Sequence, residues 1–414
     1  MNGTGTAGTI LIIGGRLQAV EKAKELGLRV VLLQHKDRLL AGQAQAADAL
    51  ICVDYLDWEV ARPMVRAAHE AYGFTAVVSL VDQAMELAGR INDLLGLEGT
   101  SHEVARRFHD KLTMRRWLAR TGFETVAAEP VADAAAVASF GALHGYPLVL
   151  KPVDGTASRG VRCVRGPAEI DEAWRRSAAL RGRADLPFAT FYPVGRFLAE
   201  EFIDGPEYSV ETFSFAGRHV VVSVTEKLSD GFVEIGHAEP ADLAPPREKM
   251  LADYVVRFLA AMELRDGVAH TEVKLSAGGP RIIESHDRVA GDRIMDLVQA
   301  VYGIDLERCA VGWPHRLVPE LPGRPVPNGA AATRFLTASP GTVVAIEGDE
   351  DVRSYPGVLD LELDVRVGDE VREIADNFDR PGQVLVRAPD IASAVELCGS
   401  LAAKVRIRTE EPAR

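Results

Sequence analysis

The chain has 414 residues, more than a single hydrophobic core usually serves, so we expect two or three domains. Apolar residues make up 47% of it and charged residues 26%, a balance that argues against a disordered or fibrous protein. The formal net charge of −13 argues against a general nucleic-acid or anionic-membrane binder, because such partners require basic surfaces.

The cysteines and the N-terminal residues further limit the classes of protein that this sequence could represent. The four cysteines are widely spaced and form no CxxC pair, which argues against a zinc ribbon, a redox motif or a disulfide framework. The N-terminus has no basic region before its short apolar run, and no stretch of about 18 apolar residues occurs. We therefore expect a cytoplasmic enzyme with neither a membrane nor a nucleic acid as partner.

Residues 1–100 alternate short apolar runs with amphipathic stretches. The runs TILIIGG, RVVLLQ, DALICVD and TAVVSLVD each precede helix-like sequence, which predicts a parallel α/β domain. Gly14 and Gly15 end the first run, where exposed N–H groups often meet an anion. Because GGRLQA lacks the full GxGxxG pattern, a substrate-facing loop, a dinucleotide site and a simple turn all stay open.

A second domain is expected over residues 101–324. Ser101 is a candidate N-cap for one long helix that ends at Gly122. The stretch YPLVLKPVDGTASRGVRCV then predicts a strand, a glycine-rich loop and a second strand, with Lys151 in the first strand. In a Walker phosphate loop the lysine follows the glycines and opens a helix, so this arrangement disfavours a P-loop NTPase.

Two strand-like runs flank Ala277-Gly278-Gly279, which predicts an antiparallel hairpin with a three-residue loop. If the hairpin is symmetric about Gly278, Glu272 lies opposite Glu284, with Cβ atoms about 5 Å apart. Two like charges so placed require a positive partner, and Mg²⁺ takes carboxylate oxygens. The two-residue period of a strand adds three side chains to the same face: Lys274, His286 and Arg288.

The alternative is a solvated edge hairpin in which the glutamates pair with lysine and arginine. The apolar neighbours GVA and RII favour a partly buried pair instead, where an unpaired charge is costly.

Residues 325–414 predict a small C-terminal α/β lobe. The proline-rich ELPGRPVP marks its boundary. Short strands over TRFLTASPGTVVAIEG, PGVLDLELDV and GQVLVRAPD are followed by an alanine-rich helix, which we expect to end the chain.

Five motifs follow one another in a characteristic order: Asp110-Lys111, Lys151-Pro152, DGTASRGV, LAEEFIDGPEYSVE and HTEV…IIESHDR. This order and spacing resemble the ATP-grasp superfamily, close to its carboxylate–amine (L-amino acid) ligase branch, with biotin-carboxylase-like architecture. The resemblance covers about residues 100–321 and, more loosely, the flanking regions. It implies an ATP-grasp fold of α/β and α+β class, with an N-terminal Rossmann-like domain and a smaller lobe at about residues 125–200 that covers the nucleotide.

The resemblance implies ATP and Mg²⁺ as cofactors. Lys111 and Lys151 match the lysines that reach the phosphates, a task that suits a compact ammonium charge, and Lys151 is also a candidate catalytic residue. The flap over the phosphates matches the loop that contains Thr156, Ser158 and Gly160. The adenine hinge matches Glu200, Glu201 and Ile203, with the Glu200 carboxylate as the side chain that accepts from the amine, and the ribose contact matches Glu207.

The metal and substrate residues follow from the same resemblance. Glu272 and Glu284 match the metal carboxylates, and Arg288 matches the arginine that faces the acyl phosphate. His286 departs from the family, which usually has asparagine there; an imidazole could bind the metal or donate to a phosphate, so Mn²⁺ is a second expected ion. The remaining substrate candidates are Gly291, Arg293, His237 and Glu211. A loop histidine is the alternative for His237, and a solvated strand face is an equal one for Glu211.

The implied reaction is an attack of a carboxylate on the γ-phosphate, followed by an attack of an amine on the acyl phosphate, with release of ADP. The expected substrates are a small-molecule carboxylate and an amine, with amino acids preferred because GVAHTEVKL and GHAEP resemble ligases of free amino acids. A biotin- or purine-type carboxylase that uses bicarbonate is the first alternative, and a catalytically silent nucleotide-binding regulatory protein the second. The sequence leaves a homodimer open.

Overall fold

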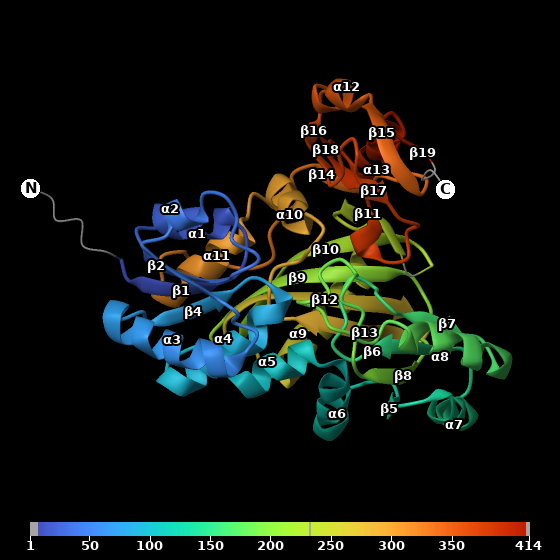
Figure 1. The fold of residues 1–414 in the computed structure, drawn as a ribbon, viewed down its shortest axis with the longest axis horizontal. Helices are drawn as coiled ribbons and strands as arrows, with labels where there is room; N and C mark the ends of the chain where they lie inside the picture. Colours follow the sequence, from blue (N-terminus) through green and yellow to red (C-terminus); the bar gives the residue numbers. More distant parts are fainter. Residues whose placement is uncertain (1–6, 232, 411–414) are drawn as a thin grey trace, which may run out of the picture.

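The computed structural model describes residues 7–231 and 233–410. Its N-terminal domain is a four-stranded parallel sheet of order β3-β2-β1-β4 (Figure 1). The strands are β1 (Thr9–Ile13), β2 (Arg29–His35), β3 (Ala49–Val53) and β4 (Ala76–Ser79). The helices are α1 (Leu17–Glu25), α2 (Gln43–Ala46), α3 (Trp58–Tyr72) and α4 (Met85–Leu95). The strands are apolar on both faces, as a covered parallel sheet requires, and the predicted parallel α/β arrangement is confirmed.

Two helices, α5 (His102–His109) and α6 (Lys111–Thr121), stand where one was predicted. Ser101 is the N-cap of α5 and Gly122 ends α6, so both predicted ends are confirmed. The prediction of an unbroken helix is wrong because Asp110 is extended, with φ −96° and ψ 106°, and its side chain accepts a hydrogen bond from the Thr113 N–H. The break places Lys111 in the first turn of α6.

A smaller lobe follows, built on an antiparallel sheet of order β5-β8-β6-β7. Its elements are β5 (Ala128–Val131), α7 (Ala134–His144), β6 (Leu148–Pro152), β7 (Arg162–Val164), α8 (Ile170–Ala178) and β8 (Phe197–Glu201). Phe140, Leu150 and Phe197 form part of its core. The predicted strand, loop and strand around the glycine-rich segment are confirmed as β6, residues 153–161 and β7.

The largest sheet has eight antiparallel strands in the order β13-β12-β9-β10-β11-β14-β18-β16. Five of them are β9 (Glu207–Phe215), β10 (Arg218–Asp230), β11 (Val233–Glu239), β12 (Gly267–Ser276) and β13 (Gly279–His286). Helix α9 (Pro245–Ala261) packs on this sheet, where Phe258 and Leu259 join Val210, Val224 and Val273 in one core. Strands β9, β10, β12 and β13 of this sheet lie between the N-terminal domain and the smaller lobe (Figure 1).

The β12–β13 hairpin brings Glu272 opposite Glu284, as predicted. The predicted three-residue loop is wrong, because Ser276 already pairs with Gly279 and leaves a two-residue turn. A bulge at Ile283 then shifts the register by one residue, which restores the expected pairing at the glutamates.

The C-terminal part adds the other three strands of the large sheet, β14 (Ala330–Phe335), β16 (Val358–Leu363) and β18 (Gly382–Ala388). A separate sheet contains β15 (Gly341–Glu347), β17 (Glu370–Val371) and β19 (Arg406–Glu410). Its helices are α12 (Asp349–Arg353) and α13 (Ile391–Ala402). Two more helices, α10 (Ile294–Tyr302) and α11 (Leu306–Gly312), precede this part and follow β13. The alanine-rich α13 was expected to end the chain, but β19 follows it. In the described residues, no helix is long and apolar enough to cross a membrane.

Candidate active site

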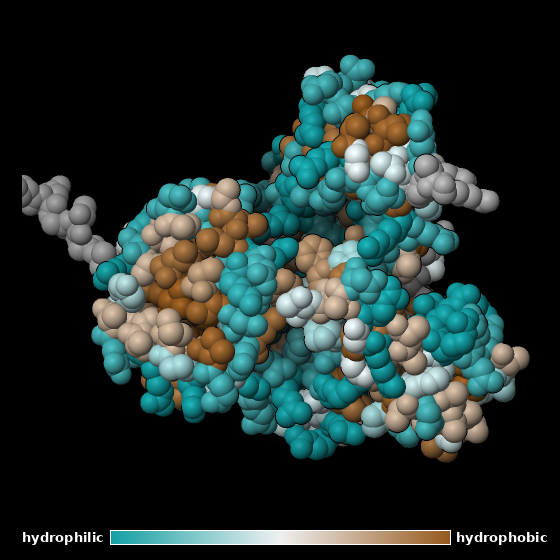
Figure 2. Space-filling model, in the orientation of Figure 1, coloured by the Kyte–Doolittle hydropathy of each residue, from teal (hydrophilic) through white to brown (hydrophobic). Residues whose placement is uncertain are grey.

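A cavity of about 1310 Å³ lies where the N-terminal domain, the smaller lobe, the large sheet and the C-terminal part meet. Figure 2 shows the surface hollowed between these parts, with mainly hydrophilic residues around the hollow. Of the residues predicted for the site, all line the cavity except Gly160 and Glu211. The N-terminal domain contributes Gly15, which fits a loop that faces the cavity.

Two lysines from different elements reach the cavity between the smaller lobe and the β12–β13 hairpin. The Lys111 Nζ donates to the Gly155 carbonyl at 2.7 Å and lies 3.0 Å from the Glu284 carboxylate. Burial alone would lower the pKa of Lys111, but Glu284 outweighs it and the pKa is raised. Lys111 is therefore a fixed cation between the flap and the predicted metal carboxylate.

The second lysine belongs to a buried three-residue ion cluster. Glu200 on β8 accepts from the Lys151 Nζ at 2.7 Å and from the Arg115 Nε at 2.7 Å. Burial would raise the pKa of Glu200, but Arg115 and Lys151 together lower it. Both Glu200 oxygens thus position cations, and the predicted contact with adenine would use their remaining lone pairs.

The other residues of the predicted adenine hinge and ribose contact also lie along this part of the cavity. The Glu201 side chain accepts from the Ala127 N–H at 2.6 Å, and the Glu201 N–H donates to the Ala127 carbonyl at 3.0 Å. Glu201 and Ile203 both line the cavity, and Ile203 is buried. Glu207 lies at the start of β9 and contacts Lys227 at 3.0 Å. These roles stay predictions.

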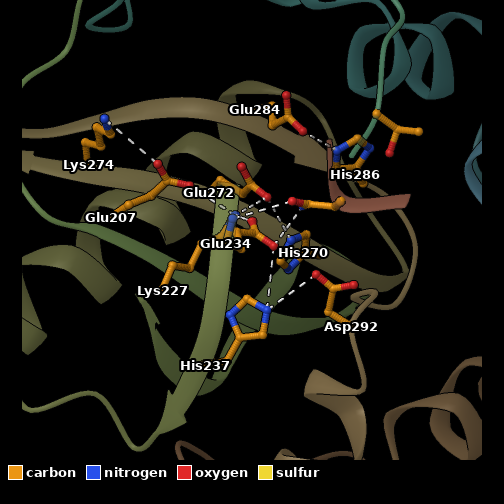
Figure 3. Close-up of polar contacts among 12 residues, drawn as sticks. Glu207, Lys227, Glu234, His237, His270, Glu272, Lys274, Glu284, His286 and Asp292 are labelled. Atoms are coloured by element: carbon orange, nitrogen blue, oxygen red, sulfur yellow. Dashed lines mark hydrogen bonds and ion pairs between the residues drawn. The ribbon is translucent and has the colours of Figure 1, made fainter. Parts of the chain in front are cut away.

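Three carboxylates surround the ammonium group of Lys227 (Figure 3). Its Nζ lies 3.0 Å from Glu207, 2.5 Å from Glu234 and 2.7 Å from Glu272. Burial would raise the pKa of Glu272, but Lys227 outweighs it and lowers the pKa to about 2. Glu272 is therefore ionised at neutral pH, as a metal ligand must be.

Glu284, His286 and Arg288 project from the end of β13 and the residues after it toward the cavity. The His286 Nε2 lies 3.0 Å from Glu284, and its Nδ1 lies 3.1 Å from Asp82. Asp82 also accepts two hydrogen bonds from the Arg288 guanidinium, one of them at 2.8 Å from Nη2. Metal binding by His286, a prediction that the described contacts leave open, would require one of its ring nitrogens to give up its carboxylate.

Glu211 lies under the cavity. It is fully buried, which excludes the solvated strand face, and its Oε1 lies 2.7 Å from the Nδ1 of His270. The other ring nitrogen of His270 lies 3.4 Å from Glu272. Burial would lower the pKa of His270, but Glu211 and Glu272 raise it to about 9. Glu211 thus contacts His270, which lines the cavity, but does not line the cavity itself.

His237 and the loop after β13 line the cavity next to Glu234, which also contacts Lys227. The His237 Nε2 lies 3.5 Å from Asp292 and 3.7 Å from Glu234 (Figure 3). Gly291 lines the cavity with free space around its Cα, which permits close approach of a ligand. Arg293 is already surrounded by carboxylates of Asp296, Asp360 and Glu362, so its predicted contact with a substrate would be shared with them.

Six site residues were missed by the sequence analysis: Asp82, Lys227, Glu234, His270, Asp292 and Arg380. Asp82 follows β4 at the carboxyl end of a parallel sheet, the edge where ligands bind in such folds, and this signal could have identified it. His270 lies two residues before Glu272 on the same strand face, so the period-2 argument could also have identified it. The other four depend on tertiary contacts that no local pattern reports.

The fold and this site define a protein of the ATP-grasp class. An ATP-grasp domain model matches residues 144–296, an ATP-grasp N-terminal domain model matches residues 20–99, and the model of L-amino acid ligase C-terminal domain 2 matches residues 334–410. The chain belongs to the ATP-grasp superfamily and carries a C-terminal domain of the L-amino acid ligase type. The predicted family and fold are confirmed.

Relatives and solved structures agree with this assignment. The chain is 28% identical to an uncharacterised protein of Sinorhizobium fredii over 341 residues, 78% of this chain and 66% of that protein. It is 34% identical to carnosine synthase 1 of Homo sapiens over 194 residues, 45% of this chain and 24% of the synthase, so it spans about a quarter of that relative. The crystal structure of the L-amino acid ligase from Bacillus licheniformis superposes with a TM-score of 0.81 at 24% identity, covering 98% of this chain and 99% of that one.

ATP-grasp enzymes use ATP with Mg²⁺, and the donor set here fits such an ion. Glu272 and Glu284 face each other across the hairpin, and both are ionised. Burial would raise the pKa of Glu284, but Lys111 outweighs it and keeps the pKa well below its usual range. Oxygen ligands of this kind suit Mg²⁺ and Mn²⁺.

Proposed function

We propose that this protein is an ADP-forming ligase that activates a carboxylate as an acyl phosphate and joins it to an amine, with amino acids as substrates. The observation that carries the proposal is the convergence of Glu272, Glu284, Lys111, Lys151 and Arg288 on one cavity. The L-amino acid ligase type of the C-terminal domain supports an amino-acid ligase over a carboxylase.

The binding roles follow from charge and position. Lys111 and Lys151 neutralise the nucleotide phosphates, while the Glu200–Arg115 pair holds Lys151 in place. Glu272 and Glu284 would hold Mg²⁺, which supplies further neutralisation of phosphate charge when bound. Residues 154–160 cover the phosphates as the flap and exclude water.

The acid substrate lies between Arg288 and Gly291 in this proposal. Its carboxylate oxygen attacks the γ-phosphorus and displaces ADP, and Arg288 stabilises the negative charge that develops on the transferred phosphoryl group. Asp82 keeps the guanidinium in this orientation. The amine nitrogen then attacks the carbonyl carbon of the acyl phosphate, phosphate leaves, and the amine proton passes to solvent or phosphate. Catalysis thus rests on positioning and on charge neutralisation.

The test is an ADP-release screen over pairs of amino acids, with Mg²⁺ or Mn²⁺, followed by mass spectrometry of any positive mixture. We expect release only when two amino acids are present, with a product equal to their sum minus water. Release that requires bicarbonate would contradict the ligase and support a carboxylase.

A variant pair separates catalysis from contamination and from silent nucleotide binding. Glu284→Ala should abolish ADP release. Glu263→Gln, which alters an exposed carboxylate paired with Arg107 away from the cavity, should retain it. Nucleotide binding without any turnover in the unaltered protein would support a regulatory protein instead.

A further inference from the structure

One short segment of the C-terminal domain contacts both the flap and the substrate end of the cavity, by which we mean the part lined by Glu234, His237 and residues 291–293. Residues 376–380, the connector segment, lie between β17 and β18 and include the short 3-10 helix Asn377–Asp379. A capping box closes the start of this helix: the Asp376 side chain accepts from the Phe378 N–H at 3.0 Å, and the Asp379 side chain accepts from the Asp376 N–H at 3.3 Å.

The first side of the connector segment holds the flap. Arg159, which is only 3% exposed, forms a two-pronged ion pair with Asp376, at 2.6 Å through Nε and 3.3 Å through Nη2. Its guanidinium also lies over the Phe378 ring, 4.8 Å from the centroid. In addition, the Asn377 N–H donates to the Ala157 carbonyl at 3.0 Å. Two flap residues therefore depend on this segment for their position.

The second side contacts the substrate end. The Arg380 guanidinium donates to Asp292 at 2.5 Å through Nη2, and its Nε donates back to the Asn377 carbonyl at 2.9 Å. The Asn377 side chain donates to Glu234 at 3.1 Å. The Arg380 Nη1 is buried without a hydrogen-bond partner among the described residues; it lies 3.7 Å from a Glu234 carboxylate oxygen, and the Arg380 side chain lines the cavity. A ligand oxygen at this end could satisfy it.

These contacts form a continuous path from Asp292 to the flap through Arg380, Asn377 and Asp376. The links are hydrogen bonds and ion pairs, except that Asn377 and Asp376 are joined by the chain itself. Asp376 is buried, and the other residues of the segment are half-buried. The path also runs through a different domain from either the flap or the substrate loop.

We propose that Asp376 and Arg380 are positioning residues for the reaction, and that the connector segment couples occupation of the substrate end of the cavity to closure of the flap over the nucleotide. The inference rests on the proposed function, because it assumes that the flap covers ATP. It assigns to the C-terminal domain a part in the ATP step, although that domain lies outside the matched ATP-grasp domain.

Hydrogen exchange measured by mass spectrometry tests the first link on the full chain with Mg²⁺ and adenylyl imidodiphosphate, a non-hydrolysable ATP analogue. Asp376→Asn should raise the exchange rate of flap amides in the nucleotide-bound protein about tenfold, the effect of losing one charge-assisted ion pair. Peptides of β9 and β10 should exchange as in the unaltered protein. Unchanged flap exchange in Asp376→Asn would overturn the proposal.

Two further variants keep the test decisive. Arg159→Lys retains the charge but loses the two-pronged geometry, and it should raise flap exchange in the same direction even if Asp376→Asn folds poorly. Asp185→Asn is the matched control, because it breaks an exposed Arg–Asp pair with Arg183 in the same lobe, and it should leave flap exchange unchanged.

The coupling is tested from the far end. Arg380→Gln should also raise flap exchange, although its side chain contacts no flap residue, and an unchanged flap would overturn the coupling. The assay requires nucleotide binding but no turnover. Loss of ligase activity with normal flap effects would therefore contradict only the proposed function, and absent flap effects in an active enzyme would contradict only this inference.

Discussion

Lys227 allows a quantitative test of how charge is balanced in the site. Its side chain is 3% exposed, and its ammonium group is the shared partner of Glu207, Glu234 and Glu272, whose side chains are 12–22% exposed. Lys227→Met keeps the length of the side chain but leaves three carboxylates facing one another. Removal of one partner from a buried ion pair costs about 3–5 kcal/mol. Because these carboxylates line a cavity that admits water, we expect the lower end, about 3 kcal/mol of unfolding free energy at neutral pH.

The measurement is urea-induced unfolding followed by circular dichroism. Lys249→Met is the matched control, since Lys249 forms an exposed pair with Asp253 that should contribute less than about 1 kcal/mol. If both variants lose the same stability, the reasoning from buried charge is refuted.

Two conditions should restore part of the stability that the Lys227→Met variant loses. Its three carboxylate groups lie within 4.8 Å of one another, so they should bind a divalent ion, and Mn²⁺ at a hundredfold excess over its Kd should add about 2.7 kcal/mol. Acidification should also narrow the stability gap, because carboxylates whose folded pKa is raised take up protons in the folded state first. If the difference in unfolding free energy between the variant and the unaltered protein changes neither with pH nor on addition of Mn²⁺, this account is contradicted.

Three other predictions follow from the same structure. Glu284→Gln should reduce ADP release by about a thousandfold at unchanged circular dichroism, because it removes charge from the proposed metal site; activity within tenfold of the unaltered enzyme would contradict that role. The pKa of His270 is about 9 in the folded protein against an ordinary 6.5. Its contribution to the free energy of unfolding, up to about 3 kcal/mol, is therefore full below pH 6.5 and is lost as the pH rises to 9. The variant His270→Gln should flatten the dependence of stability on pH between these values. Gly89→Ala should destabilise the protein by about 2 kcal/mol despite the better helix propensity of alanine, because the added Cβ would lie 2.7 Å from the backbone of His102. Gly399→Ala, where nothing lies within 4 Å of the added Cβ, should instead stabilise α13 by about 0.5–1 kcal/mol. Equal shifts of the melting temperature for the two variants would refute the packing argument.

The sequence predicted those parts of the site that local periodicity controls. The parallel strands follow from continuous apolar runs that precede helix-like sequence, and the strand–loop–strand around the flap follows from apolar runs on either side of a glycine-rich turn. The Glu272–Glu284 pairing follows from the two strand-like runs and the glycines between them. The pairing of Glu272 with Glu284 was predicted from a three-residue loop that the structure does not have. The actual turn is one residue shorter, and the extra residue at the Ile283 bulge restores the predicted pairing. Bulges leave no reliable mark in a sequence of this composition.

The parts that were not predicted depend on long-range contacts. Asp82 meets Arg288 across 206 positions of the chain, and Arg159 meets Asp376 across 217. The helix break at Asp110 was missed because aspartate is also an ordinary surface residue within a helix, and only its hydrogen bond to Thr113 reveals the second cap. The site is thus assembled by tertiary structure from residues that look ordinary in their local sequence.

The continuity of the eight-stranded sheet has a practical consequence. Strands β14, β18 and β16 extend the same sheet beyond β11, so a cut near the proline-rich boundary would not release two finished domains. It would leave the backbone N–H and C=O groups of β11 unpaired along one edge and those of β14 along another. Open edges of this kind are templates for pairing between chains. We expect the two fragments made by a cut near residue 325 to aggregate when each is produced alone. When they are produced together, the edges of β11 and β14 can pair again.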